Sequence, residues 1–489
     1  MKTRVYATTL LLLLFALAGF AAAAPKSSPD DGDKQLIAIT NVNVIPMDRE
    51  RVLEDQTVVI RGGRIHKIGP ASRLKAPKGA RLLDGRGKYL MPGLVDMHTH
   101  LFSDDDQFPE QLADEELFLM LANGVTTARL MIGTPEHLKY RARIAKGELA
   151  SPTLYVASPQ LTGRKQGSTF NGRVVTKADE ARAAVRDFKA AGYDFIKLTN
   201  FITPEVYEAV VSEAKKEKIR VVGHVDTRVG VRRALEAGQQ IEHLDAYLES
   251  VLKDDSPIKT SVSDIGLFRK ENWESLDYID EAKVREIAKA TARANIYSTP
   301  TLTFFKMVYG FGMKEDEIRA LPEFRFAPTQ MRDAWFAGNK RLLERQASEA
   351  RRMKYVRVRD MLVKEIHDAG GKIMAGSDTP ELFLLYGWAL HREIKNLNAA
   401  GLSPYAALAA ATRNPAEYLG ALKEIGTVEQ GKRADLILLN ANPLEDVGNT
   451  ERRAGVMVRG RWFTEEELKR RLDEIAPLFQ HALDEKTSN

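Results

Sequence analysis

The sequence predicts an α/β protein: a (β/α)8, TIM-like barrel with a small β-sandwich domain formed by both ends of the chain. Between residues 92 and 424, apolar runs typical of strands alternate with amphipathic helical stretches, as in a parallel sheet. Before and after this region, residues 36–91 and 425–463 carry short β-rich runs separated by turns, including a hairpin signal at Gly62-Gly63. The 489 residues suit a barrel of about 250 residues or more with an accessory domain.

Eight apolar runs supply the strands of the predicted barrel. They occupy residues 93–100, 125–132, 153–159, 194–200, 220–225, 240–244, 296–302 and 372–379. Amphipathic stretches at 177–191, 204–217 and 281–294 fill gaps between them and predict helices. A closed barrel of this type has eight strand–helix units, so the eight runs are most simply explained by a closed barrel.

The seventh strand is followed by a long charged and aromatic insertion, residues 305–357. Loops at this end of a barrel shape the site, so the insertion is a candidate lid or substrate wall. Helical padding or a subunit contact is the alternative interpretation. Residues 464–489 predict a C-terminal helical tail.

The first 24 residues have the pattern of an export signal. Lys2 and Arg4 precede an apolar run from Leu10 to Phe20, and small residues at 21–24 suit cleavage. A retained membrane anchor is the alternative, although the run is short for a span. Residues 25–35 then predict a flexible polar tether. We therefore expect an exported protein, periplasmic or secreted.

Composition limits the partners of the protein. The formal net charge is +5, and removing Lys2 and Arg4 with the signal lowers it to +3, with both signs mixed along the chain. So small a charge does not predict nucleic-acid binding. We expect a small-molecule substrate and no association with a membrane after the signal is removed. Assembly into a homo-oligomer is possible on this composition. The absence of cysteine excludes disulfides and thiolate ligands, so any metal would be held by histidine and carboxylate.

Six ionisable residues fall at the carboxyl ends of the predicted strands, where barrel enzymes keep their sites. They are His98, His100, Lys197, His224, His243 and Asp378. His98 and His100 are two apart on one strand, so both imidazoles point the same way. Singly, each has an ordinary structural explanation, such as a buried core histidine or a helix-capping aspartate. Together they predict a metal site at the mouth of the barrel.

These motifs resemble the amidohydrolase superfamily. The runs MPGLVDMHTH, FIKLTN, VVGHVDTRVGVRRALEAGQQIEHLDAY and AGSDTP carry the resemblance. The later runs HREIKNLNAAGLSPYAALAAATRNPAEYLG and GTVEQGKRADLILLN are similar to its prolidase-like and imidazolonepropionase-like branch. The resemblance covers about residues 36–463.

The resemblance implies a site with two divalent metal ions, for which we expect zinc. His98, His100 and Asp378 would hold one ion, His224 and His243 the other, and Lys197, carboxylated on its amine, would bridge both. A free lysine, whose ordinary pKa is about 10.4, would be a cation repelled by the metals, whereas a carbamate is an anion with two oxygens. Asp378 would orient the metal-activated water, take its proton and pass it to the leaving amine.

The predicted reaction is hydrolysis of an amide, in a dipeptide or an N-acyl amino acid. Arg164, Lys165 and Arg228 lie on predicted loops at the catalytic end and could bind a substrate carboxylate. Tyr247 could reach a leaving group or carbonyl. Ordinary solvated surface charge is the alternative for each of these cations.

Other reactions suit the same site. A cyclic amide, a cyclic imide or a lactone are alternative substrates. A deaminase is a rival, but related deaminases usually lack the strand-four lysine and carry an HxxE element, which His224-Val225-Asp226-Thr227 does not match. His391 is expected to be structural. A non-catalytic periplasmic binding protein would be expected to have lost ligands, yet all six are present.

Overall fold

The structure is a computed structural model of the chain, and it describes residues 36–101, 112–165, 172–257, 270–309, 314–345 and 347–481. The predicted export signal, residues 1–24, and the predicted tether, residues 25–35, lie outside these ranges. Within the described ranges, none of the helices is both long enough and apolar enough to cross a bilayer.

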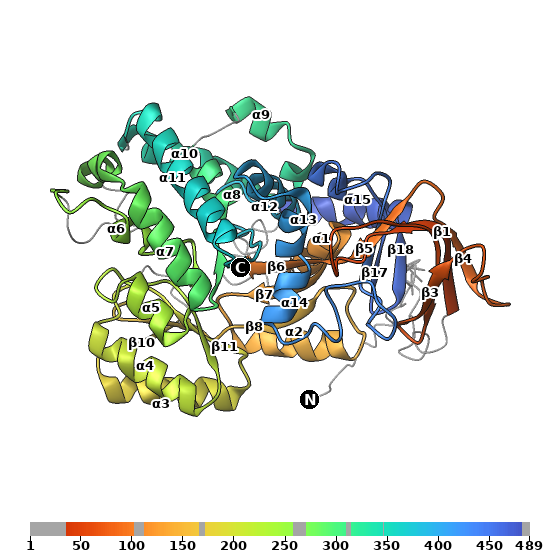
Figure 1. Cartoon of the computed structure of the whole chain (residues 1–489), viewed down its shortest axis with the longest axis horizontal. Helices are drawn as coiled ribbons and strands as arrows, with labels where there is room; N and C mark the ends of the chain where they lie inside the picture. Colours follow the sequence, from red (N-terminus) through yellow and green to blue (C-terminus); the bar gives the residue numbers. More distant parts are fainter. Residues whose placement is uncertain are drawn as a thin grey trace, which may run out of the picture.

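Strands from both ends of the chain form one mixed sheet at one end of the molecule (Figure 1). Its members are β1 (Leu36–Val44), β2 (Leu53–Arg61), β3 (Arg64–Pro70), β4 (Arg81–Asp84), β5 (Tyr89–Pro92), β16 (Leu436–Leu439), β17 (Arg453–Val458) and β18 (Arg461–Thr464). The order is β18-β17-β16-β5-β1-β2-β3, with β4 beside β1. Antiparallel pairing of β5 with β16 joins the two ends. Among the described residues these strands form one hydrogen-bonded sheet, and its division into the two layers of a sandwich stays a prediction.

The hairpin between β2 and β3 turns at Gly62 and Gly63, as the sequence predicted. Arg61 pairs with Arg64 across the turn, and the two glycines have φ of 55° and 69°. A two-residue hairpin of this kind needs positive φ at both central positions, which glycine adopts without steric cost.

Each of the eight predicted barrel runs contains a parallel strand. They are β6 (Leu94–Thr99), β7 (Val125–Leu130), β8 (Thr153–Val156), β11 (Phe195–Leu198), β12 (Arg220–Gly223), β13 (Gln240–Glu242), β14 (Tyr297–Thr299) and β15 (Lys372–Ile373). The first three form one sheet, and the other five form a second sheet with the short strands β9 (Gln160–Thr162) and β10 (Gly172–Val174). Most residues of these strands are buried, as their apolar sequences predict. A strand that is covered on both faces lacks the alternation of polar and apolar residues seen in a half-exposed strand.

Main-chain pairing continues across both seams between these two parallel sheets. At one seam Ala157 bridges Phe195, and the amide of Ser158 donates to the Phe195 carbonyl at 2.8 Å. At the other, Thr99 bridges Thr379, and the amide of His100 donates to the Thr379 carbonyl at 2.7 Å. The residues that follow β8 and β15 are therefore hydrogen-bonded to the neighbouring parallel sheet.

Helices occupy the three amphipathic stretches that the sequence singled out: α3 (Ala178–Ala191), α4 (Pro204–Lys216) and α7 (Glu281–Arg293). The side chains of Thr203 and Asp280 cap the amides at the starts of α4 and α7. Pro204 occupies the first turn of α4, where its missing N–H costs nothing. In Figure 1, α3 and α4 lie side by side with α5 (Val231–Ala237) at the end of the molecule away from the mixed sheet.

The described part of the predicted insertion is mainly helical. It contains the end of α8 (Leu302–Val308), then α9 (Glu315–Arg319), α10 (Thr329–Arg345) and the first part of α11 (Glu349–Asp368). The predicted tail forms α15 (Glu465–His481), and residues 482–489 lie outside the described ranges. Arg325 pairs with Asp473 of α15 at 2.7 Å, and Phe326 packs edge-on against Phe479. The part of the insertion that contains Arg325 and Phe326 therefore packs on the tail.

Candidate metal centre

One cavity of about 350 Å³ collects all six residues that the sequence singled out. His98 lies in β6 and Lys197 in β11; His224, His243 and Asp378 follow the ends of β12, β13 and β15, and His100 follows β6. Because the strands are parallel, their carboxyl ends meet on one side, and side chains distant in sequence converge there.

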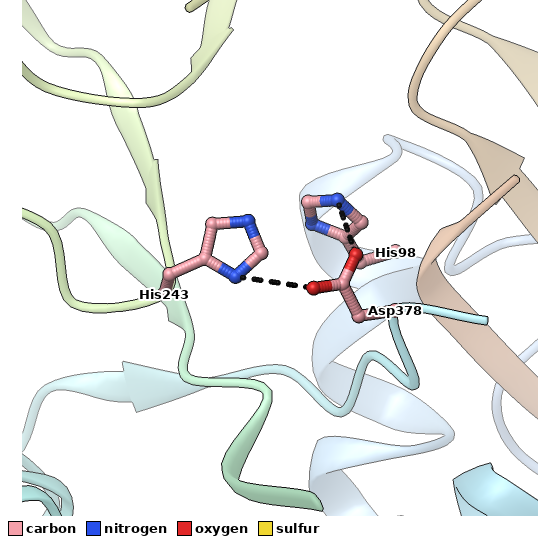
Figure 2. A group of neighbouring side chains, drawn as sticks. All are labelled: His98, His243 and Asp378. Atoms are coloured by element: carbon pink, nitrogen blue, oxygen red, sulfur yellow. Dashed lines mark ion pairs between the residues drawn. The ribbon is translucent and has the colours of Figure 1, made fainter. Parts of the chain in front are cut away.

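Asp378 lies at the centre of the group. Its Oδ1 is 3.3 Å from Nε2 of His98 and 3.5 Å from Nε2 of His100, and its Oδ2 is 3.7 Å from Nδ1 of His243. Figure 2 shows its carboxylate between the rings of His98 and His243. One potential ligand atom from each of these three residues lies within 4.8 Å of the others. Two imidazoles and a carboxylate at this spacing are a donor set that suits a divalent ion such as zinc.

The remaining imidazole stacks on this group. The ring of His224 lies 4.8 Å from that of His243 with an interplanar angle of 24°. The ring of His243 is in turn 4.6 Å from that of His98. Burial holds the pKa of His98 and of His243 well below the ordinary histidine value. Both are therefore neutral imidazoles, the form that binds metals.

Three of the imidazoles have a hydrogen-bonding partner at Nδ1. The distance is 2.8 Å from His98 to Oε2 of Glu242, 2.7 Å from His224 to Oδ2 of Asp245, and 2.8 Å from His243 to Oγ1 of Thr301. A partner at one ring nitrogen fixes the ring and leaves the other nitrogen for a metal. Sequence reasoning missed these partners, although Glu242 and Asp245 stand within two residues of His243 in the same motif.

Lys197 is the one lysine among the cavity-lining residues that the structure describes. Its side chain is buried on β11, between apolar neighbours in the sequence. Burial lowers its pKa to about 8, although the charges of Glu242 and Asp378 act in the opposite direction. A lowered pKa increases the fraction of neutral amine, which is the form able to react with carbon dioxide.

The backbone is strained at two of these positions. His243 has φ of 59° and Asp378 has φ of 56°, a left-handed conformation uncommon for residues other than glycine. A residue keeps such a conformation only where the surrounding structure holds it, and residues of this kind are concentrated at functional sites. The amide of Asp378 is held by the carbonyl of His98, and the amide of His243 by the carbonyl of Thr299.

The predicted substrate-binding residues do not line the cavity. Tyr247 is fully buried, and its hydroxyl hydrogen-bonds to Thr291, so it cannot reach a substrate in this structure. The guanidinium of Arg228 donates to both carboxylate oxygens of Asp226. That of Arg164 lies over the ring of Phe201 at 3.7 Å, and neither it nor Lys165 lines the cavity. Neighbouring side chains thus hold the two guanidinium groups, and a carboxylate clamp formed by these cations stays a prediction.

Other side chains complete the walls of the cavity. They are Ile132, Gln160, Asp245, Phe304, Phe305 and Glu381. Phe304 and Phe305 come from α8, so the start of the predicted insertion does supply a wall of the site. His391, expected to be structural, lies elsewhere: it is buried in α12 (Trp388–Ala399) and hydrogen-bonds to Thr450 and to the carbonyl of Asn123.

Comparison with known proteins agrees with this geometry. An imidazolonepropionase from Arthrobacter sp. strain FB24 is 33% identical over 184 residues, which are 35% of this chain and 44% of that relative. The alignment thus spans less than half of that relative's length. A 5-methylthioadenosine/S-adenosylhomocysteine deaminase from Caldanaerobacter subterraneus is 23% identical over 83% of this chain and 85% of its own.

Among solved structures, a Bifidobacterium longum protein assigned as a prolidase superimposes with a TM-score of 0.64 and 26% identity, covering 90% of this chain and 98% of its own. Such neighbours imply a TIM-barrel-like α/β fold for the region of parallel strands. The sequence pattern of the amidohydrolase family matches residues 89–463, which include all six cavity residues described above. The chain belongs to the amidohydrolase family.

Proposed function

We propose that the protein hydrolyses an amide bond, in a dipeptide or an N-acyl amino acid, with the help of two divalent ions, for which we expect zinc. One observation carries the proposal: four histidines, a buried lysine and an aspartate line a single cavity at the carboxyl ends of parallel strands. Family membership supports hydrolysis at a carbon–nitrogen bond. The choice of an open-chain amide rests on the sequence resemblance to the prolidase-like branch.

Within the proposal, His98, His100 and Asp378 would hold one ion, and His224 and His243 would hold the other. Lys197, carboxylated on its amine, would bridge them. The burial of Lys197 and its lowered pKa, about 8, support its conversion to a carbamate. When bound, the ions would activate water at neutral pH and polarise the substrate carbonyl.

Asp378 is the proposed acid–base group. Its carboxylate faces three imidazoles, so it lies where the attacking water would be held. In this position it orients the water, accepts its proton and returns that proton to the leaving amine. The left-handed backbone of Asp378 supports a functional reason for its placement.

The walls of the cavity favour a substrate with an apolar portion. Phe304, Phe305 and Ile132 offer apolar contact, and Gln160 offers an amide for hydrogen bonding. Glu381 is an exposed carboxylate on the same cavity, and no arginine lines it among the described residues. Recognition of a substrate carboxylate by an arginine therefore has no support from the lining of this cavity. Cyclic amides, cyclic imides and lactones stay alternative substrates.

We further propose that the eight parallel strands close into a barrel over residues 92–424, on which the sheet from 36–91 and 425–463 packs as an accessory domain. The hydrogen bonds at both seams support closure. Export through the segment 1–24, and action as a periplasmic or secreted enzyme, are proposed from the sequence pattern alone.

Deamination is the second candidate, because the deaminase relative aligns over most of both chains. The two reactions differ in product: an open-chain amide yields a carboxylate and an amine, whereas a deaminase releases ammonia from a ring carbon. The test is turnover by the zinc-loaded protein of dipeptides, N-acyl amino acids, cyclic imides, lactones and aminopurine nucleosides, with a chelated sample as control. We expect metal-dependent turnover of the open-chain amides. Ammonia release from the nucleosides without any amide turnover would contradict the proposal.

A further inference from the structure

A buried ionic network lies directly behind His98. Oε2 of Glu242 is 2.8 Å from Nδ1 of His98, and Oε1 of the same carboxylate accepts from Nη2 of Arg129 at 2.6 Å. The side chains of Arg129 and Glu242 are fully buried, and that of His98 is 1% exposed. His98 lies in β6, Arg129 in β7 and Glu242 in β13, so the network joins β13 to two strands that come much earlier in the sequence.

The network defines which nitrogen of His98 carries the proton. An ionised carboxylate only accepts hydrogen bonds, so the ring must donate to Glu242 from Nδ1. A neutral imidazole with its proton on Nδ1 has its lone pair on Nε2. In this structure Nε2 is the atom that faces Asp378, at 3.3 Å. Glu242 therefore selects the tautomer that can bind a metal on the cavity side.

Arg129 contacts both Glu242 and the main chain next to His98. Its Nε donates to the carbonyl of Met97, the residue before His98, at 2.7 Å, and its Nη1 donates to Oε1 of Gln240 at 2.7 Å. The guanidinium also lies over the rings of Phe195 and Tyr418, 5.5 and 5.7 Å from their centroids. Its charge offsets that of the buried carboxylate, which would otherwise be costly to keep ionised away from water.

We propose that Glu242 is a positioning residue for His98 and that Arg129 holds its carboxylate in place, so that this pair sets the affinity of the metal centre. The inference rests on the proposed metal centre but not on the choice of substrate. Neither residue lines the cavity, so neither contacts the substrate in this account.

A comparison of four variants separates positioning from simple stabilisation. Glu242→Leu removes the acceptor of His98, Arg129→Met removes the cation, and the double variant removes both charges together. Glu242→Gln keeps an acceptor oxygen without the charge. The full chain of each variant is measured for unfolding of the metal-free form by urea and for zinc affinity by competition with a chromophoric chelator.

Removing one charge of the pair leaves the other buried and unpaired. Glu242→Leu and Arg129→Met should therefore each be less stable to urea than the wild type. The double variant should recover much of that stability. Zinc affinity should nevertheless stay about 10- to 100-fold below that of the wild type in the double variant, the usual effect of losing the partner of a ligating histidine. Glu242→Gln should retain more affinity than Glu242→Leu.

Gln240→Met is the matched control, because Gln240 contacts the same guanidinium but no histidine in the described hydrogen bonds. It should lower stability and leave zinc affinity within about twofold. If the double variant binds zinc as tightly as the wild type, Arg129 and Glu242 form only a structural ion pair and the inference is wrong. If the wild type itself binds no zinc, the proposed function fails instead. Should a single variant not fold, the double variant and Glu242→Gln still decide the question.

Discussion

Nδ1 of His224 lies 2.7 Å from Oδ2 of Asp245, which stands two residues after His243 in the segment that follows β13. One segment thus contributes a potential ligand and the partner of a ligand from the neighbouring strand. Asp245 also reaches the cavity wall, which Glu242 does not. The two carboxylates therefore offer separate tests of how histidine orientation affects the site.

Asp245→Asn should weaken metal binding through His224. The amide keeps the shape of the carboxylate but not its charge, so the hydrogen bond from Nδ1 becomes weaker. We expect zinc affinity to fall by about 10- to 100-fold with little change in the unfolding of the metal-free protein. Chelator competition measures the first and urea unfolding the second. An unchanged affinity would show that His224 needs no carboxylate to hold its ring.

Asp378→Asn should lower kcat by about 10² or more, because it removes the group proposed to accept and return a proton. The KM should change much less, since the residue is proposed to act on water rather than to bind substrate. Steady-state kinetics on the best open-chain amide measures both. Near-normal turnover in a protein that still contains its metal would assign the acid–base role to another residue.

Phe304→Ala should raise the KM for substrates with an apolar portion. Phe304 is half-buried on the cavity wall, and losing its contact area costs binding free energy of about 1–3 kcal/mol when the ring is covered by substrate. Arg228→Gln is the control: its guanidinium is held by Asp226 and does not line the cavity, so kcat/KM should stay within about twofold. A large loss in Arg228→Gln, confined to substrates with a free carboxylate, would instead show that Arg228 binds that carboxylate.

Removal of metal should abolish activity, and its return should restore it. The purified protein, analysed by mass spectrometry of its metal content, is expected to hold close to two divalent ions per chain, because the donor set has more ligands than one ion needs. Dialysis against a chelator followed by readdition of zinc tests reversibility. Full activity with one ion or none would reject the binuclear site.

Sequence reasoning located the strands well because their signal is local. Apolar runs such as 194–200 must be buried on both faces, and ionisable residues near the carboxyl ends of parallel strands meet on one side of the fold. His98, Lys197 and Asp378 could be placed in one cavity for that reason alone. The hairpin at Gly62-Gly63 was predictable because two positive φ angles leave few alternatives to glycine.

What the sequence could not predict depends on which side chains meet in space. Arg228 has the charge to bind a carboxylate, but Asp226, two residues earlier, already holds it. The contact of Arg129 with Glu242 joins residues 113 apart in the sequence, and no local pattern indicates it. Phe304 belongs to the wall of the cavity only because α8 turns inward after β14.

Substitution of Lys197 tests whether its carboxylated side chain bridges two metal ions. Lys197→Ala should lose metal and activity together, because the bridging oxygens are gone. A short carboxylic acid added in solution could lend oxygens in the vacated space and restore part of both. Lys197→Arg offers no such space, and its guanidinium cannot be carboxylated and keeps its charge beside the metals.

The measurement is therefore the metal content and the activity of Lys197→Arg, purified beside the wild type and Lys197→Ala, with and without acetate. We expect Lys197→Arg to hold less than one ion per chain, to be inactive, and not to be rescued by acetate. A Lys197→Arg protein that is active and carries two ions would contradict the bridge.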